Sequence, residues 1–212
     1  MSLQEEIRHR ILDRGLNQTN MDPDPFGQFS SWLGDARDAG VLYPSAMSLA
    51  TVDTQGAPSQ RMVMLRDFDV QGLLFYTSLG SHKAEHLAQN SHASALFPWH
   101  MLERQVQIRG RATQLSKIEV MKSFATRSKA SQLSSWLSQQ SAPVSTRGAL
   151  ENKLKEIKAK FARGDISMPA FWGGYRIVPD SFEFWQTGQD QVNDRFVYRR
   201  DGEGWQLERI AP

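Results

Sequence analysis

The stretch that decides the fold is RQVQIRGRATQL, residues 104–115. In its first half the apolar residues Val106 and Ile108 alternate with the polar residues Gln105, Gln107 and Arg109. Successive side chains of an extended chain point to opposite faces, so this period of two predicts a β-strand with one face in the core and one wetter face. Such alternation is typical of an antiparallel sheet.

Similar patterns lie on both sides of this stretch. Segments with β-branched, aromatic or alternating residues predict further strands at 46–53, 60–68, 72–78, 93–99, 171–179, 181–187, 194–200 and 205–210. The predicted helices span 25–40, 81–90, 117–127, 130–140 and 145–164. Three of them have start signals: Asp24 followed by Pro25, a capping serine at Ser81, and a capping box of Ser116 with Glu119.

No repeat, low-complexity tract or linker divides the chain. Residues 24–212 are therefore predicted to form a single domain. It is mainly β with peripheral helices (α+β), with seven or so antiparallel strands in a barrel or sandwich. Residues 1–23 are polar with little periodicity, and we expect them to form a mobile N-terminal arm.

The composition is that of an ordinary globular protein: 212 residues, 40% hydrophobic and 23% charged. A net charge of +2 gives no strong field to recruit nucleic acid or anionic lipid. The absence of cysteine excludes disulfides, thiolate metal sites and cysteine nucleophiles. No apolar run is long enough to span a membrane, and MSLQEEIRHR lacks the apolar core of a secretory signal, so we expect a cytoplasmic location.

Several familiar catalytic motifs are absent, including the dinucleotide-binding glycine pattern, the phosphate-binding Walker loop and the zinc-protease His-Glu-x-x-His. His82 and His86 are four residues apart on a predicted helix, a spacing that can hold a metal. An exposed helix face beside Lys83 and Glu85 explains the pair equally simply, and we expect no metal site.

The basic residues suggest an anion site instead. Arg61 and Arg66 lie on one predicted strand, and His82 and Lys83 lie at the start of a helix two elements later. Helix amides, a lysine and a guanidinium together favour a phosphate dianion. Scattered surface charge remains the alternative. Arg127 with Ser131 could hold a second anion in the same way.

The stretch FWQTGQDQVNDRF, residues 184–196, combines two aromatic residues near its start with acids and amides. This mixture fits the wall of a pocket for a flat, polar ligand. The edge of a β-hairpin would have the same composition, so both interpretations stay open.

Read together, several segments resemble the pyridoxamine 5′-phosphate oxidase family. They are QRMVMLRDFD, FYTSLGSHKAEHL, LFPWHMLERQVQIRGRATQLS, SQQS, FWGGYRI, EFWQ, DRF and LERIAP. The resemblance runs in one collinear order from about residue 24 to residue 212.

The resemblance implies an FMN-binding split β-barrel that works as a homodimer, with FMN in two clefts at the subunit interface. By position it implies that Arg61 and Lys83 bind the FMN phosphate, with His82 where the family usually has arginine. The other implied cofactor residues are Met62, Val63, Met64, Leu65, Arg66, Tyr76, Thr77, Gln105, Gln140, Ser141, Trp185 and Arg195.

The substrate side departs from the family pattern. For the substrate phosphate the family usually has Lys, Tyr, Arg and Ser, and this chain offers Arg66, Ser123, Arg127 and Ser131. The family's Arg-Leu-His run, which holds the pyridine ring, is replaced by Gln191, Val192 and Asn193. Two groups able to carry positive charge have thus become neutral amides.

The implied function is an FMN-dependent oxidase of pyridoxamine or pyridoxine 5′-phosphate in vitamin B6 metabolism, with hydride transfer to the flavin and reoxidation by O₂. No residue is assigned as an acid or base. One alternative is a paralogue that oxidises another flat polar substrate, as the phenazine-biosynthesis branch does. Another is a flavin- or pyridoxal phosphate-binding protein without turnover.

Overall fold

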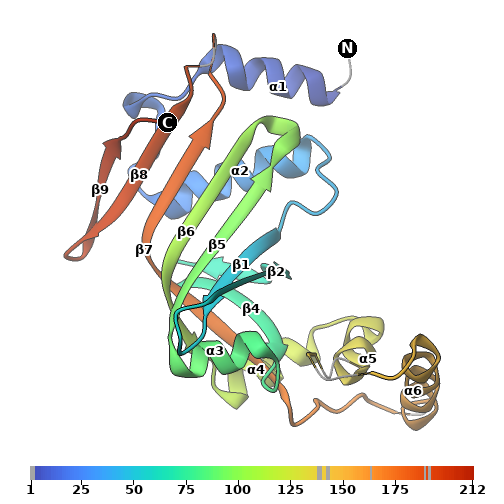
Figure 1. The fold of residues 1–212 in the computed structure, drawn as a ribbon. Coiled ribbons are helices and arrows are strands. Elements are labelled where there is room, and N and C mark those ends of the chain that lie inside the picture. The colour runs from blue at the N-terminus through green and yellow to red at the C-terminus, as the bar shows by residue number, and fades with distance from the viewer. Residues whose placement is uncertain (1–2, 138–139, 142–143, 163, 189, 191) are drawn as a thin grey trace.

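The structure is a computed structural model that describes residues 3–137, 140–141, 144–162, 164–188, 190 and 192–212. Its strands form one antiparallel sheet in the order β2-β1-β5-β6-β7-β4-β3, with β8 on β7 and β9 on β8 (Figure 1). Their bounds are β1 Ala46–Val52, β2 Pro58–Met64, β3 Asp67–Asp69, β4 Gly72–Ser78, β5 His92–Trp99, β6 Arg104–Gln114, β7 Trp172–Gln186, β8 Asp194–Asp201 and β9 Gly204–Arg209. The predicted mainly β architecture is confirmed.

Strand β7 organises the sheet. It pairs with β6 along its length, with β4 along its first half and with β8 along its second half. The sequence predicted two strands here, divided near Pro179. The pairing instead continues past Pro179, because the register shifts opposite Arg109 and Gly110 and leaves Asp180 unpaired. A side chain at Gly110 would place its Cβ 2.0 Å from the carbonyl oxygen of Val178, so the close approach requires glycine.

The predicted single strand at 60–68 is divided in the structure. Strand β2 pairs with β1 and ends at Met64, after which the buried Leu65 donates its N–H to the carbonyl of Ser45 at 2.8 Å. The next residue, Arg66, donates its N–H to Leu74 of β4 at 2.8 Å. The chain thus crosses from the β1 edge to β4, which curls the sheet toward a barrel and places Arg61 and Arg66 near β4.

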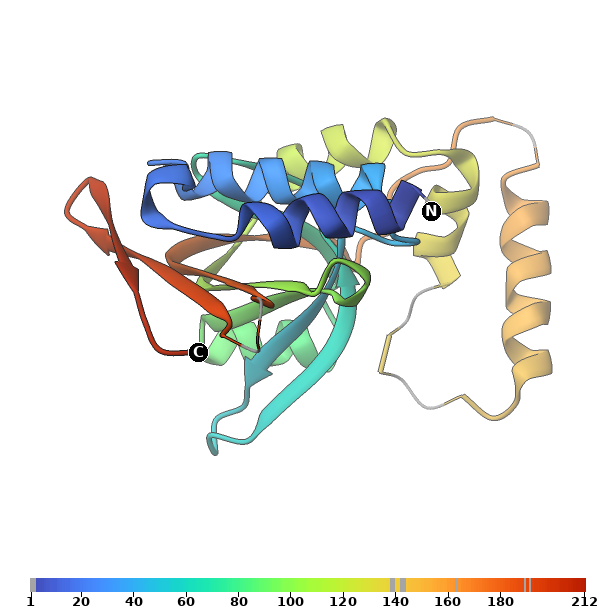
Figure 2. The same ribbon diagram turned by 90° about the horizontal axis from the view of Figure 1, so that it is seen from above.

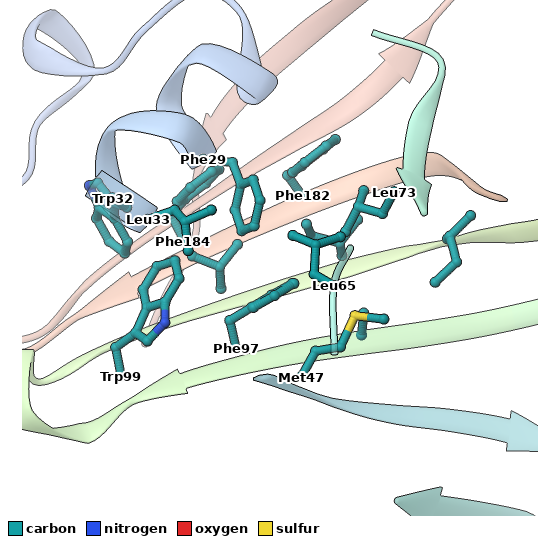
Figure 3. Packing of buried hydrophobic residues seen from close by; sticks show 14 of the residues in the cluster. Phe29, Trp32, Leu33, Met47, Leu65, Leu73, Phe97, Trp99, Phe182 and Phe184 are labelled. Carbon is teal, nitrogen blue, oxygen red and sulfur yellow. The ribbon is translucent and has the colours of Figure 1, made fainter. Parts of the chain in front are cut away.

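The main core lies between the sheet and helix α2, Pro25–Asp38 (Figure 3). As predicted, Asp24 caps this helix, accepting the N–H of Phe26 at 3.2 Å, and Pro25 opens it. Phe29 packs on Phe97 of β5 with ring centroids 4.9 Å apart, and Trp32 packs edge-on against Phe184 of β7 at 5.1 Å. Burying these aromatics supplies much of the driving force for folding.

The N-terminal segment forms helix α1, Leu3–Arg14, and the short 3-10 helix η1, Gln18–Asn20. Ile7 and Ile11 are buried, and the carbonyl of Ile11 accepts a hydrogen bond from Gln186 of β7 at 3.3 Å. A second 3-10 helix, η2, spans His100–Leu102 and contacts α1. The predicted mobility of residues 1–23 stays a prediction.

The remaining helices are α3 His82–Gln89, α4 Lys117–Ala125, α5 Lys129–Leu137 and α6 Arg147–Lys160. The predicted capping box of Ser116 and Glu119 is present at the start of α4. The predicted side-chain cap by Ser81 is wrong, because its hydroxyl donates to the carbonyl of Ser78 at 2.7 Å. Helices α5 and α6 stand away from the sheet, opposite the β8–β9 hairpin (Figure 2). Within the described residues, no helix has the length and apolar character needed to cross a membrane.

Candidate active site

A cavity of about 760 Å³ opens between β2, β4, the start of α3 and the turn between α4 and α5. Strand β2 supplies one wall through Arg61 and the residues that follow it, and β4 supplies Tyr76 and Thr77. The full set of lining residues is Ser45, Arg61, Met62, Val63, Met64, Leu65, Arg66, Tyr76, Thr77, Lys83, Thr126, Arg127, Ser128, Ser131, Gln140 and Trp172. The cavity is therefore lined by both polar and apolar residues, and several of the apolar ones lie on β2.

Lys83 is a buried cation at one corner of this cavity. Its Nζ donates to Gln140 Oε1 at 2.8 Å and to Thr77 Oγ1 at 3.2 Å, both neutral oxygens. Burial, and then the charge of Arg61, lower the pKa of Lys83 to about 8. A charge taken out of water without a counter-ion is costly. The corner is therefore arranged for an anion that neutralises it.

Arg61 is the second cation of this corner. Its Nη1 donates to Thr51 Oγ1 at 2.7 Å and to the carbonyl of Leu49 at 3.2 Å, both on neighbouring strand β1. Burial lowers the pKa of Arg61 as well. Among the described residues neither Arg61 nor Lys83 forms an ion pair with a carboxylate. Two adjacent uncompensated cations fit a phosphate group, which is the anionic end of FMN.

The cavity contains a second basic corner. Arg127 lies over the ring of Trp172, with its guanidinium carbon 4.9 Å from the ring centroid. Its pKa is lowered, first by burial and then by the charge of Arg66. Ser131, near the start of α5, completes this corner. An arginine held over an aromatic ring can present its donors to a second phosphate or carboxylate.

A glycine on β7 makes room for Tyr76, one of the lining residues. Gly174 of β7 is paired with Tyr76 of β4, and an added Cβ would lie 2.7 Å from the Tyr76 ring. The missing side chain allows the Tyr76 ring to lie across the strand beside the cavity.

Three of the predicted cofactor residues lie elsewhere. Gln105 of β6, Trp185 of β7 and Arg195 of β8 are register partners and form one row across the sheet. Trp185 is 13 residues from Trp172, the cavity residue at the start of β7, which is about 40 Å along a strand. Within one chain this row does not reach the cavity.

The row is nevertheless well ordered. Arg195 makes two hydrogen bonds to the carboxylate of Glu183, each at 3.0 Å, and a third to the carbonyl of Ala211 at 3.2 Å. Trp185 is half-buried on this face, whereas Phe184 on the opposite face is fully buried in the core. The two faces of the sheet thus follow the alternation that residues 104–115 predict, with Val106 and Ile108 also buried.

The stretch 184–196 is a β-hairpin in the structure, since β7 and β8 pair from Trp185–Arg195 to Gln186–Asp194 before the connection. Of the two predicted substrate residues here, Gln191 lies outside the described residues. The side chain of Asn193 accepts the backbone N–H of Gly188 at 3.3 Å, so its oxygen closes the loop. Its predicted contact with substrate stays a prediction.

Three other predicted residues do not line the cavity. His82 and Ser141 meet at the start of α3, where the His82 N–H donates to Ser141 Oγ at 3.2 Å, and neither lines the cavity. Ser123 on α4 does not line it either. Sequence reasoning missed Ser45, Thr126, Ser128 and Trp172 as lining residues. Only Trp172 lay in a quoted family segment, FWGGYRI. No cluster of potential metal ligands occurs among the described residues.

Two family models match the chain. One, described as pyridoxamine 5′-phosphate oxidase, matches residues 33–161. The other, described as the pyridoxine 5′-phosphate oxidase C-terminal dimerisation region, matches residues 172–212. Together they include both basic corners of the cavity and the row of Gln105, Trp185 and Arg195.

Curated relatives match over nearly their whole length. A protein of Yersinia pestis named pyridoxine/pyridoxamine 5′-phosphate oxidase is 49% identical over 207 residues, covering 98% of this chain and 95% of the relative. A protein of the same name from Serratia proteamaculans is 50% identical over the same coverage.

Solved structures agree on the fold. PhzG from Burkholderia lata 383, in complex with tetrahydrophenazine-1-carboxylic acid, has a TM-score of 0.86 at 30% identity and covers 93% of this chain and 98% of its own. An FMN binding protein from Nostoc punctiforme, related to pyridoxamine 5′-phosphate oxidase, has a TM-score of 0.72 at 21% identity, covering 91% of this chain and 100% of its own. The family models and the curated relatives show that the chain belongs to the pyridoxamine 5′-phosphate oxidase family.

Proposed function

We propose that this chain is an FMN-dependent oxidase of pyridoxine or pyridoxamine 5′-phosphate. The observation that carries the proposal is the pair of basic corners in one cavity. Arg61 and Lys83 form one corner and Arg66 and Arg127 form the other, without carboxylate partners for Arg61, Lys83 or Arg127 among the described residues. One corner suits the phosphate of the cofactor and the other suits the phosphate of the substrate.

When bound, FMN would supply the acceptor for a hydride from the substrate carbon that bears the amine or alcohol, and O₂ would reoxidise it, taking up the electron pair and two protons as hydrogen peroxide. Lys83 and Arg61 hold the cofactor phosphate, and Thr77 and Gln140 fix the lysine ammonium. Met62, Val63 and Met64 of β2 line the cavity, and a flat ring system can lie against this strand.

At the substrate end, Arg127 lies over the ring of Trp172 and, with Arg66 and Ser131, would bind the second phosphate. These residues orient the substrate and need not exchange protons with it, because orientation alone supplies a large part of the rate enhancement. No residue in the cavity is assigned as a general acid or base. The reaction then depends on how the substrate is positioned, and the neutral amides of Gln191 and Asn193 can take part in that positioning.

We place the row of Gln105, Trp185 and Arg195 in the cofactor site of a partner subunit. This row lies on the half-exposed face of the sheet, far along β7 from the chain's own cavity. Met62 is 61% exposed and Met64 is 49% exposed, although both line that cavity. In a homodimer, the row of one subunit can cover the cavity of the other. This arrangement explains both the distance of the row from its own cavity and the exposure of Met62 and Met64. The match of residues 172–212 to a dimerisation region supports this arrangement.

A phenazine-type substrate is the second candidate. PhzG, the solved relative of 30% identity, was crystallised with a tricyclic carboxylic acid. In this chain the basic corner of Arg66 and Arg127 could bind a carboxylate as well as a phosphate. The higher identity of the curated oxidases, 49–50%, favours the phosphorylated pyridine.

The experiment is to load the purified protein with FMN and measure hydrogen peroxide release. Pyridoxine 5′-phosphate, pyridoxamine 5′-phosphate and a reduced phenazine carboxylic acid serve as alternative substrates. We expect peroxide with the two phosphates in proportion to the aldehyde formed. A protein that binds FMN but releases peroxide only with the phenazine acid would move the assignment to the second candidate. A protein that does not bind FMN would overturn both.

A further inference from the structure

A histidine behind the phosphate corner is connected to it through a buried hydroxyl. His86 lies on α3, one turn after Lys83, and its Nδ1 is 3.1 Å from Thr51 Oγ1. The same oxygen accepts a hydrogen bond from Arg61 Nη1 at 2.7 Å. Thr51 is fully buried on β1, and His86 does not line the cavity. The three side chains form one chain of contacts that runs from the helix, through the strand, to the cavity wall.

The direction of one hydrogen bond follows from the groups involved, and that of the other depends on the tautomer of His86. Arginine has donors only, so the Thr51 oxygen accepts from Arg61. The hydroxyl has one proton of its own to donate, and His86 Nδ1 lies close enough to accept that hydrogen bond. Neutral histidine accepts at Nδ1 when Nε2 carries the ring proton. With this tautomer, His86 fixes the rotation of the hydroxyl so that a lone pair of its oxygen points at Arg61.

We propose that His86 is a positioning residue for the cofactor phosphate, which acts on Arg61 through the hydroxyl of Thr51. The inference rests on the proposed FMN site and adds to it a residue that touches neither cofactor nor substrate. Its role is to keep the Arg61 guanidinium in one place before the phosphate arrives. A donor that is fixed in advance loses less conformational entropy on binding than one that must be ordered.

Titratable groups from three elements lie near His86. Arg61 stands across Thr51, and Lys83 and His82 lie on the same helix, with Glu85 as the neighbouring acid. From β7, the neutral hydroxyl of Tyr175 contacts the carbonyl of Ala84 at 3.5 Å, and burial raises the pKa of Tyr175.

The test compares two substitutions that both remove the imidazole. His86→Asn places an amide oxygen near the position of Nδ1 and keeps an acceptor for Thr51, whereas His86→Leu keeps a similar volume without an acceptor. FMN affinity of the apoprotein is measured by quenching of flavin fluorescence at pH 8. We expect about three- to tenfold weaker binding for His86→Leu, the range for one hydrogen bond, and near wild-type binding for His86→Asn. His92→Leu, which removes an exposed histidine on β5, is the matched control.

A double-mutant cycle with Thr51→Val tests the route. If His86 acts through the hydroxyl, His86→Leu has no further effect on FMN affinity in the Thr51→Val background. Equal loss in the His86→Asn and His86→Leu proteins, or additive effects of the two sites, would overturn the inference. The Lys83→Met variant tests the proposed FMN site independently of the role of His86. If that variant binds FMN as tightly as wild type, the phosphate corner itself is misassigned.

Discussion

The ionisation of Lys83 gives a sharp test of the phosphate corner. Without ligand, burial and then the neighbouring Arg61 lower the pKa of this lysine to about 8 from its ordinary 10.5. A bound phosphate dianion favours the charged ammonium and raises the pKa again. Above pH 8 the free protein must therefore take up a proton in order to bind FMN. The sign follows: FMN affinity is full below pH 8 and falls as the pH rises above it.

The size of the effect comes from the same shift. If phosphate restores the ordinary pKa of 10.5, the difference from about 8 is worth ~3 kcal/mol at the high-pH limit, at 1.36 kcal/mol per unit. Only part of this is reached at pH 9, where roughly nine in ten free lysines are neutral. We therefore expect the Kd for FMN to be about tenfold higher at pH 9 than at pH 7.

The assay is a flavin fluorescence titration of the apoprotein at pH 7, 8 and 9 and constant ionic strength. Lys83→Met should bind FMN about 1.5–3 kcal/mol more weakly at pH 7, the range for a hydrogen bond to a charged group, and should lose most of the pH dependence. Lys83→Arg keeps its charge over this range and serves as the control. If wild type and Lys83→Met show the same pH dependence, Lys83 does not bind the phosphate and the reasoning fails.

Three further predictions concern the substrate end and the dimer. Arg127→Ala should raise KM for pyridoxine 5′-phosphate about ten- to a hundredfold, measured by steady-state kinetics, and leave FMN affinity nearly unchanged in a flavin titration. An unaltered KM would show that Arg127 does not bind the substrate. At an FMN concentration too low for either variant alone to be active, mixing Lys83→Met and Trp185→Ala subunits should restore peroxide release, because one of the two shared sites in the mixed dimer is intact. No recovery after subunit exchange would argue against shared sites. The double change Gln191→Arg with Asn193→His should raise the rate constant for pyridoxine 5′-phosphate oxidation about ten- to a hundredfold, and a slower double mutant would favour a different natural substrate.

Local sequence signals predicted much of the fold. The alternation of Val106 and Ile108 with polar residues gave the correct faces of β6, and Asp24 with Pro25 gave the start of α2. Arg61 and Lys83 were expected to share a phosphate site and do line one cavity. These inferences succeeded because periodicity and capping depend on neighbours within a few residues.

Inferences that depend on long-range geometry were less complete. Alternation assigns Trp185 to a face of the sheet but does not give its distance from the cavity along the strand. The division of the strand at Leu65 arises from bonds to Ser45 and Leu74 in other elements, which no local pattern records. The side chain of Asn193 bonds the backbone of its own loop, a local detail that residue type alone does not specify.

The most direct measurement of the central claim is a crystal structure of the protein with FMN. The account predicts a dimer in which the FMN phosphate lies within hydrogen-bond distance of Arg61 and Lys83 of one subunit. Trp185 of the other subunit should then lie beside the flavin. A flavin phosphate bound away from Arg61 and Lys83, or a complete site formed by one subunit alone, would contradict the account.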